Sequence, residues 1–359
     1  MTGPTGSGLD SGSGLDFGRR VVVVRGASVS LRFGVRTAVI CGVLGLAALA
    51  VGVLALGTGE FEVPVGEVVR VLLGGEPGPA RLVIMEWRLP RVLLSLLIGM
   101  ALGLSGAVFQ SLMRNPLGSP DVIGFNTGAY TGVLVTMMFV GRDYYQTAAG
   151  ALAGGLLAAA AVYLLAYRKG VQGFRLIIVG IAVSAILGAA NQWFVIKVNL
   201  QTAVAAAIWG QGSLNTLTWD QVLPVAVSVA LPTALLVALG PRLSLLAMGD
   251  DAAAALGVRT ERSRLAYLVI GVALTAVATA AAGPISFVAL AVPQLARLLT
   301  RTAGIALMPS AVTGALLLAT SDWLAQRAFA PTQLPVGIVT VSLGGVYFAW
   351  LLARQARSR

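Results

Sequence analysis

The stretch RNPLGSPDVIG, residues 114–124, decides how this chain is expected to fold. It separates two apolar runs, LLSLLIGMALGLSGAVFQSLM before it and FNTGAYTGVLVTMMFVG after it. Proline removes the backbone donor that would continue a helix, and the pairs Asn-Pro and Pro-Asp are typical of turns. The pattern therefore predicts two helices joined by a polar turn.

Composition places the chain among membrane proteins. Hydrophobic residues fill 57% of the 359 positions and charged residues 11%, with a mean hydropathy of +0.87. A soluble domain carries roughly 25% charged residues, so a bilayer must surround this much apolar surface. The 44 glycines suit closely packed transmembrane helices. We therefore expect an all-α fold with several membrane-spanning helices.

Two residue types limit the chemistry that the chain can perform. Cys41 is the one cysteine, which excludes an internal disulfide and fits a core position in the first apolar run. The sequence has no histidine, the commonest metal ligand and the commonest general base. We therefore assign no catalytic and no metal-binding residue.

The chain divides into a tail and a membrane domain. Residues 1–36 repeat GSGLD, are rich in Gly and Ser and end with several arginines, which predicts a flexible basic cytoplasmic tail. The first apolar run begins too late for a cleavable signal peptide, so we expect residues 37–359 to be retained as one transmembrane domain. A span needs about 20 apolar residues. This length predicts about ten spans, at residues 37–56, 92–113, 124–140, 147–167, 175–196, 219–240, 264–283, 286–302, 308–326 and 336–353.

The placement of Lys and Arg predicts the orientation. If the N-terminus is cytoplasmic, 18 of the 25 Lys and Arg residues fall in cytoplasmic segments, as the positive-inside rule requires. Both termini and the turn at residues 114–124 are then cytoplasmic. A pI near 10.8 would otherwise suggest nucleic-acid binding, but the charge is scattered through short loops, so we expect no nucleic-acid partner.

Five ordered motifs indicate a family. RLPR at residues 88–91 is followed by GMALGLSGAVFQ and RNPLGSPDVIGFNTGA; WGQGSL begins at Trp209, GDDAAAALGV at Gly249, AGPISFVALAVPQLARLL at Ala282 and LPVGIVT at Leu334. Together they strongly resemble the FecCD family, the permease subunits of bacterial ATP-binding-cassette (ABC) importers for iron–siderophores and vitamin B12. The resemblance covers residues 37–355 and is closest to the ferric-enterobactin branch. It implies a type II ABC importer fold in the bacterial cytoplasmic membrane, with residues 37–359 as the permease domain.

The resemblance implies a cytoplasmic coupling helix near residues 244–263, which sits in a cleft of an ATP-hydrolysing partner. The coupling residues are Gly249, Asp250, Asp251, Ala252, Leu256, Gly257 and Arg259. From the residues themselves, we expect Asp250 or Asp251 to cap the helix and Gly257 to end it in a left-handed turn. Arg259, Arg262 and Arg264 can pair with acidic groups of the partner. An ordinary capped loop helix explains the same pattern.

The source of energy is expected on another chain. No G-x-x-x-x-G-K-[ST] motif is present, so no P-loop binds ATP here. ATP and Mg²⁺ therefore belong to separate ABC ATPase subunits, and this chain is a transport subunit that is not an enzyme and binds no cofactor.

On the opposite side, the resemblance implies that Arg88, Arg91 and Arg327 dock an extracytoplasmic siderophore-binding protein through its carboxylates. The alternative is that the arginines anchor helix ends at the lipid head groups. The family pattern D-x-x-A-R before E-L-P-V-G is altered here. Gln326 occupies the arginine position, with Arg327 one residue late, and Gln333 replaces the glutamate, which puts the role of Arg327 in doubt.

The translocation route has two sets of candidates. The resemblance implies a cytoplasmic gate at Gln172, Gly173 and Phe174, with Phe174 as a hydrophobic plug. Polar or aromatic side chains within apolar runs are candidates for the substrate path, although helix–helix hydrogen bonds explain the polar ones equally well. The path candidates are Gln110, Asn126, Asn191 and Trp193.

Other function classes fit less well. A secondary transporter usually carries charged relays inside the membrane, whereas every acidic residue here is expected in a loop or near a span end, Asp322 being the deepest. An intramembrane enzyme would need paired carboxylates, histidine or a serine–lysine pair at depth. A scaffolding protein would leave the coupling segment unexplained.

The substrate implied by the resemblance is a ferric siderophore, of the catecholate type; vitamin B12 and haem remain alternatives. The lack of histidine argues against direct capture of a bare metal or of haem iron. The family pairs two permease chains, so we expect this chain to form half of a dimeric pore with an identical or paralogous mate. Membrane lipid is the remaining expected partner.

Overall fold

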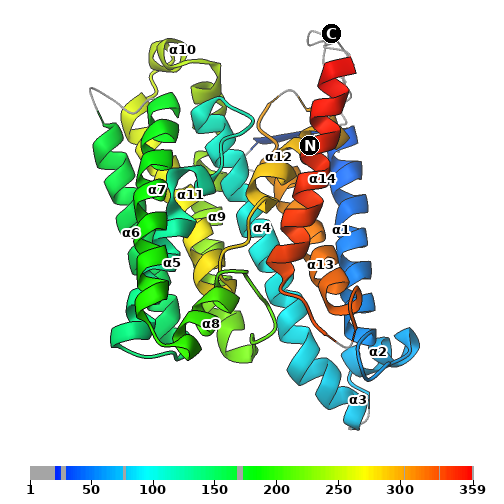
Figure 1. The fold of residues 1–359 in the computed structure, drawn as a ribbon. Helices are drawn as coiled ribbons and strands as arrows, with labels where there is room; N and C mark the ends of the chain where they lie inside the picture. The colour runs from blue at the N-terminus through cyan, green and yellow to red at the C-terminus, as the bar shows by residue number, and fades with distance from the viewer. Residues whose placement is uncertain are drawn as a thin grey trace, which may run out of the picture.

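The computed structural model describes residues 21–25, 30–75, 78–167, 173–302, 304–330 and 332–357, and nearly all of them lie in helices (Figure 1). In chain order, the longer elements are α1 Val35–Gly57, α4 Leu89–Met113, α5 Phe125–Phe139, α6 Tyr144–Ala166, α7 Gly173–Lys197, α9 Trp219–Met248, α11 Thr260–Ala282, α12 Val288–Thr300, α13 Leu307–Arg327 and α14 Val336–Arg357. The shorter helices are α2 Val65–Leu72, α3 Pro79–Leu82, a π-helix η1 Val83–Arg88, a 3-10 helix η2 Pro120–Ile123, α8 Leu200–Trp209 and α10 Asp250–Ala255.

Each of the ten predicted ranges coincides with one of the ten longer helices. Six helical segments in the described part of the chain are long and apolar enough to cross a membrane. They are α1, α6, α7, α9, α11 and the continuous segment Pro79–Met113 that contains α4. The helical fold of the membrane domain is therefore confirmed, while the number of ten spans remains a prediction.

Regular structure begins before the predicted membrane domain. Strands β1 Val21–Arg25 and β2 Ser30–Gly34 pair as an antiparallel hairpin that leads into α1. Part of the range 1–36 that was predicted to be a flexible tail is therefore paired backbone.

Helix α4 forms the centre of the bundle. It packs against α13, α11 and α12, and 78% of the most apolar window of its segment is buried, against 11% for α7. Small residues on α4 permit this packing. A Cβ added at Gly99 would lie 2.8 Å from the carbonyl carbon of Gly314, and one added at Gly103 would lie 3.0 Å from that of Ser310. The helix backbones are thus nearly in contact, as expected of the glycine-rich composition.

The bundle has two ends that differ in their elements. The start of α1, the end of α14 and the short helix α10 lie at one end, named here the upper end (Figure 1). Helices α2, α3 and α8 lie at the opposite, lower end (Figure 1).

The stretch that separates α4 from α5 penetrates the bundle. A Cβ at Gly124 would meet the Oγ of Ser184, near the middle of α7, and the ring of Phe125 faces Gly155, near the middle of α6. Helix α5 has 15 residues, a length of about 22 Å at 1.5 Å per residue, whereas a bilayer core measures about 30 Å. The expectation that the whole turn lies at one end of the bundle is therefore wrong. The stretch leaves the upper end and reaches the middle of the helix layer.

Polar groups of this penetrating stretch form hydrogen bonds to one another and to α11. The side-chain amide of Asn126 donates to Asp121 Oδ1, and the hydroxyl of Thr279 on α11 donates to Asn126 Oδ1 at 3.1 Å. Asp121 is therefore an acidic group within the bundle, whereas the sequence predicted it in a loop. Its amide partner supplies the hydrogen bond that a buried carboxylate requires.

Candidate functional site

Helix α10 at the upper end has the predicted left-handed terminus. Gly257 has φ +80°, its N–H donates to Ala254 O at 2.9 Å, and the N–H of Val258 donates to Ala253 O at 3.0 Å. These two bonds form a Schellman motif, which satisfies the last carbonyls of the helix. The helix is shorter than the range 244–263, because residues 244–248 still belong to α9.

The expectation that Asp250 or Asp251 caps α10 is wrong. The N-cap is Gly249, and no side chain caps the helix. Asp250 instead accepts hydrogen bonds from Arg114 Nη2 at 2.6 Å and Arg264 Nη2 at 2.7 Å. Arg264 is therefore engaged within the chain, and the expectation that it pairs with an acidic group of a partner is corrected.

Arg114 connects three helices, α4, α9 and α10. It follows the last residue of α4 in a left-handed conformation with φ +47°, which is unusual for a residue with a side chain. Its Nη2 also donates to Leu246 O of α9 at 3.0 Å. The guanidinium thereby connects the end of α4 to α9 and α10, so these elements are held as one unit.

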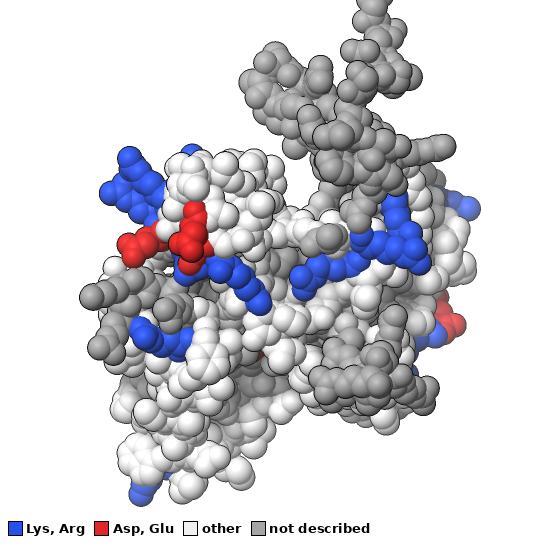
Figure 2. Space-filling view, turned by 90° about the horizontal axis from the view of Figure 1, so that it is seen from above, with Lys and Arg blue, Asp and Glu red and all other residues white. Residues whose placement is uncertain are grey.

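The remaining coupling residues form an exposed surface. Asp251, Leu256, Gly257 and Arg259 are exposed and Ala252 is half-buried, whereas Ala253 is buried against the bundle. Acidic and basic side chains lie side by side over this half of the upper end (Figure 2). A small, charged protrusion of this kind can enter a cleft of another protein.

At the lower end, two of the three predicted docking arginines have internal partners. Arg91 forms a bidentate pair with Asp322, Nε to Oδ2 at 2.9 Å and Nη2 to Oδ1 at 2.8 Å; the Asp322 side chain is buried and that of Arg91 is nearly so. Arg88 donates to Leu56 O at 2.8 Å and to Phe61 O at 2.7 Å. In this conformation, both guanidinium groups donate hydrogen bonds within the chain and do not point towards a partner.

Arg327 is the docking candidate that remains accessible. Its Nη2 lies 3.1 Å from Glu62 Oε1; the side chain of Arg327 is 42% exposed and that of Glu62 is 79% exposed. The pair connects the end of α13 to the loop after α1. It offers both a basic and an acidic group on the surface of the lower end.

Two of the three gate residues lie within the described part of the chain; Gln172 lies outside it. Gly173 begins α7, and a Cβ there would approach Met113 Cα to 2.9 Å, so α7 starts against the end of α4. The side chain of Phe174 is 75% exposed. The aromatic ring thus projects from the bundle and does not fill it.

The polar candidates for the substrate path contact neighbouring helices. Gln110 donates to Leu290 O of α12 at 2.8 Å, and Asn191 donates to Thr127 O of α5 at 3.3 Å. Asn126 is held between Asp121 and Thr279, as described above. These contacts favour the alternative of helix–helix hydrogen bonds. Trp193, which is largely exposed on α7, is the path candidate with a free surface.

One contact that the sequence did not predict lies between α4 and α12. Arg297 Nη2 donates to Gln110 Oε1 at 2.5 Å, beside a cavity of about 240 Å³ that also touches Arg114 and Ser111. Arg297 lies in the motif AVPQLAR, but the motif gives no indication of its partner 187 residues away. The cavity lies directly beneath the upper end.

Known proteins resemble this chain along nearly its whole length. A sequence model described as the FecCD transport family matches residues 46–354. The ferric enterobactin transport system permease protein FepG of Escherichia coli (strain K12) is 50% identical, over 90% of this chain and 98% of FepG. The achromobactin transport system permease protein CbrC of Dickeya dadantii (strain 3937) is 34% identical over 97% of this chain and 99% of CbrC. A solved metal-chelate type ABC transporter in an inward-facing conformation has a TM-score of 0.79 and 27% identity, over 88% of this chain and 99% of its own.

Proposed function

Because this chain belongs to the FecCD transport family, we propose that it is the permease subunit of an ABC importer that carries a ferric siderophore across the bacterial cytoplasmic membrane. The observation that carries the substrate class is the 50% identity with FepG, which extends over 98% of that protein. The name of FepG assigns it to ferric enterobactin, a catecholate, and the name of CbrC assigns that relative to achromobactin. A chelated iron is already fully ligated, so the permease need only offer a wide path with weak contacts.

The pore itself requires a second permease chain, identical or paralogous. Support comes from α7 and α14, which face the viewer in Figure 1. Both helices carry apolar side chains that are exposed in the described part of the chain. On α7, these include Ile178, Ile181 and Ile186. A mate on this face would place Phe174 and Trp193 at the boundary between the two chains, where a gate and a path are needed.

Energy enters through α10, with ATP and Mg²⁺ bound by separate ATPase subunits. The support is the exposed surface of Asp251, Leu256 and Arg259, together with the unit formed by Arg114, Asp250 and Arg264. A force on α10 would pass through this unit to α4 at the centre of the bundle. In this arrangement the upper end is cytoplasmic, and both termini lie on that side.

Replacing Gly257 with Val is expected to reduce uptake, because the left-handed conformation costs a residue with a side chain about 1–2 kcal/mol. A Cβ at this position would meet no atom within 4 Å, so the effect arises from the backbone alone. Siderophore uptake and siderophore-stimulated ATP hydrolysis should be measured with the complex reconstituted in vesicles.

Gly257→Asn is the matched control for this prediction. Asn tolerates the left-handed conformation far better than a β-branched residue, so its uptake should stay near that of the parent protein. Equal uptake by the Val and Asn variants, at equal abundance in the membrane, would contradict a role for the helix terminus in coupling.

We assign docking of the extracytoplasmic binding protein to the lower end. The exposed Arg327–Glu62 pair carries this assignment, with Arg91 positioned behind it by Asp322. Exposed charges of this kind give orientation and a fast encounter more than affinity.

The experiment that tests the substrate is radioactive iron uptake by a strain that lacks this gene, with and without a plasmid copy. We expect restored uptake of ferric enterobactin and weaker or no restoration with a hydroxamate chelate. Restoration of vitamin B12 or haem uptake without any ferric chelate would overturn the substrate class but retain the importer.

A further inference from the structure

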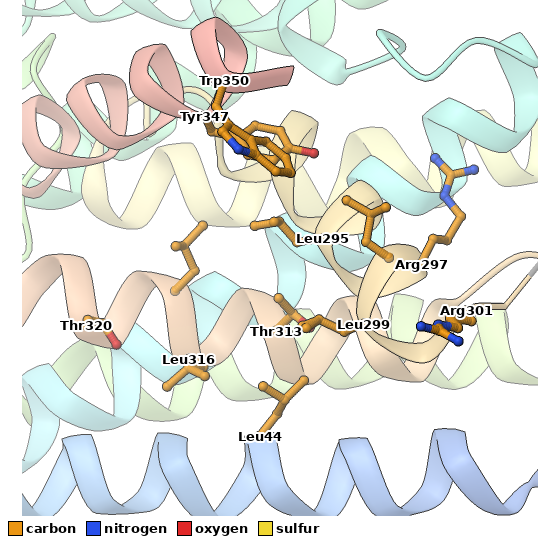
Figure 3. A pocket seen from close by; sticks show the side chains of 12 residues that line it. Leu44, Leu295, Arg297, Leu299, Arg301, Thr313, Leu316, Thr320, Tyr347 and Trp350 are labelled. Carbon is orange, nitrogen blue, oxygen red and sulfur yellow. The ribbon is translucent and has the colours of Figure 1, made fainter. Parts of the chain in front are cut away.

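An apolar groove opens between α1, α12, α13 and α14 near the upper end (Figure 3). Its volume is about 790 Å³, which is large enough for a bound small molecule. The walls are formed mainly by leucines, with Leu44 from α1, Leu295 from α12 and Leu316 from α13, and the rings of Tyr347 and Trp350 from α14 cover one side. None of the site residues assigned above, apart from Arg297 at its rim, belongs to this groove.

The groove is at least as deep as one leaflet of a bilayer. Thr320 is the deepest lining residue on α13, 13 residues after the start of that helix at Leu307. At 1.5 Å per residue, this corresponds to about 20 Å, against about 15 Å for half of the hydrocarbon core. A single acyl chain that enters from the upper end can therefore lie along the groove.

The upper rim of the groove is basic. Arg301 and Arg297 both line it, and their side chains lie at one end of the leucine cluster (Figure 3). Arg36 is held nearby, because its Nη2 donates to Leu299 O at 3.2 Å. Basic side chains also form a row over this half of the upper end, away from the acidic side chains of the other half (Figure 2).

The partners of these arginines decide which of them is available to a ligand. Arg297 is committed to Gln110. Among the described residues, Arg301 makes no hydrogen bond or ion pair, and its backbone is fixed in a left-handed turn with φ +52° at the end of α12. Its guanidinium is thus a cation at the headgroup level, directly above an apolar channel.

A buried hydroxyl adds a polar contact inside the groove. Thr313 is 5% exposed, and its Oγ1 has no hydrogen-bond partner among the described residues. The residue lies six positions after the start of α13, about 9 Å below the rim. Such a hydroxyl can donate to an ester carbonyl of a lipid.

We propose that this groove binds one anionic phospholipid, with an acyl chain between the leucines and the phosphate at Arg301. Basic pockets between helices at the cytoplasmic face are typical sites for anionic lipid headgroups. The bound lipid would fill the space beside α12, whose other side touches α4 through the Arg297–Gln110 bond.

The test is native mass spectrometry of the full-length protein released from nanodiscs of equal parts phosphatidylglycerol and phosphatidylcholine. We expect one phosphatidylglycerol to be retained per chain in preference to phosphatidylcholine. Arg301→Gln should retain phosphatidylglycerol about fivefold less well, the change that corresponds to about 1 kcal/mol for one basic residue near an anionic surface. Leu316→Trp should reduce retention of both lipids, because the indole fills the channel.

Arg262→Gln is the matched control, since it removes one exposed arginine from the same end but outside the groove. It should retain phosphatidylglycerol as the parent protein does. Equal retention of the two lipids by the parent protein, or equal loss in the Arg262 and Arg301 variants, would overturn the headgroup assignment.

A second measurement distinguishes lipid from protein in the groove. In a Cys41→Ser background, Thr320→Cys should form no disulfide-linked dimer under oxidising conditions and should react with a lipid-soluble maleimide. An efficient disulfide between two copies would show that a second chain fills the groove, and it would overturn the proposal.

Discussion

Replacing Asp322 with Ala is expected to destabilise the protein by about 3–5 kcal/mol, because it leaves the guanidinium of Arg91 buried without a counter-charge. The two side chains are 3% and 11% exposed, and two hydrogen bonds of 2.8 and 2.9 Å join them. Gln326 also donates to Asp322 at 3.0 Å and would lose its acceptor. The measurement is the unfolding midpoint of the purified protein in mild detergent.

Two control variants test whether the loss of stability comes from burial of the unpaired charge. Glu62→Gln breaks the exposed pair with Arg327 at the same end, and we expect no measurable change in the midpoint, because exposed pairs contribute little. The double variant Arg91→Met with Asp322→Leu should recover much of the lost stability, since both charges are then removed. If Asp322→Ala and Glu62→Gln unfold alike, the buried pair does not stabilise the fold.

Replacing Gly106 with Ala is the second change with a large expected effect. A Cβ at this position would clash with the carbonyl oxygen of Ala289 and lie 3.0 Å from its Cα, so α4 and α12 must separate. Overpacking by a methyl group costs about 1–3 kcal/mol and more where the neighbour is backbone. We expect a loss near the upper limit, together with a shift in the Arg297–Gln110 contact that joins the same two helices. The folded fraction after membrane extraction is the measurement.

Gly42→Ala on α1 serves as the control for Gly106→Ala. A Cβ there would meet no atom within 4 Å, so the substitution should be neutral or slightly stabilising through helix propensity. A Gly106→Ala protein that folds as well as Gly42→Ala would show that α4 and α12 are not closely packed.

The helices could be predicted from the sequence because each apolar run is long and bounded by polar residues. The depth of α5 could not, since a turn with Asn and Pro looks the same at the surface and inside the bundle. Its depth is set by Gly124 against Ser184 and by Phe125 against Gly155, contacts between residues that are distant in the chain. The position of Asp121 within the bundle could not be predicted for the same reason, because it depends on how deep the stretch reaches.

The candidate site divides in the same way. Gly257 could be predicted because the Schellman motif depends on residues within one turn of helix. Asp250 could not, because its partners lie 136 and 14 residues away, and these pairings replaced the expected cap. For Gln110, Asn126 and Asn191, the sequence left two explanations open, and the contacts to other helices favour the hydrogen-bonding one.

The pairing of Arg91 with Asp322 also constrains how the protein is made. The two residues are 231 positions apart, and a ribosome adds about 5–20 residues per second, so roughly 10–50 s separate their synthesis. During that interval the start of α4 carries a cation with no counter-charge, and a cation is costly in lipid. Until α13 arrives, this cation therefore stays at the head-group level or in water and not in the lipid core. The central helix thus reaches its final packed position late in biogenesis, although its residues are among the first to enter the membrane.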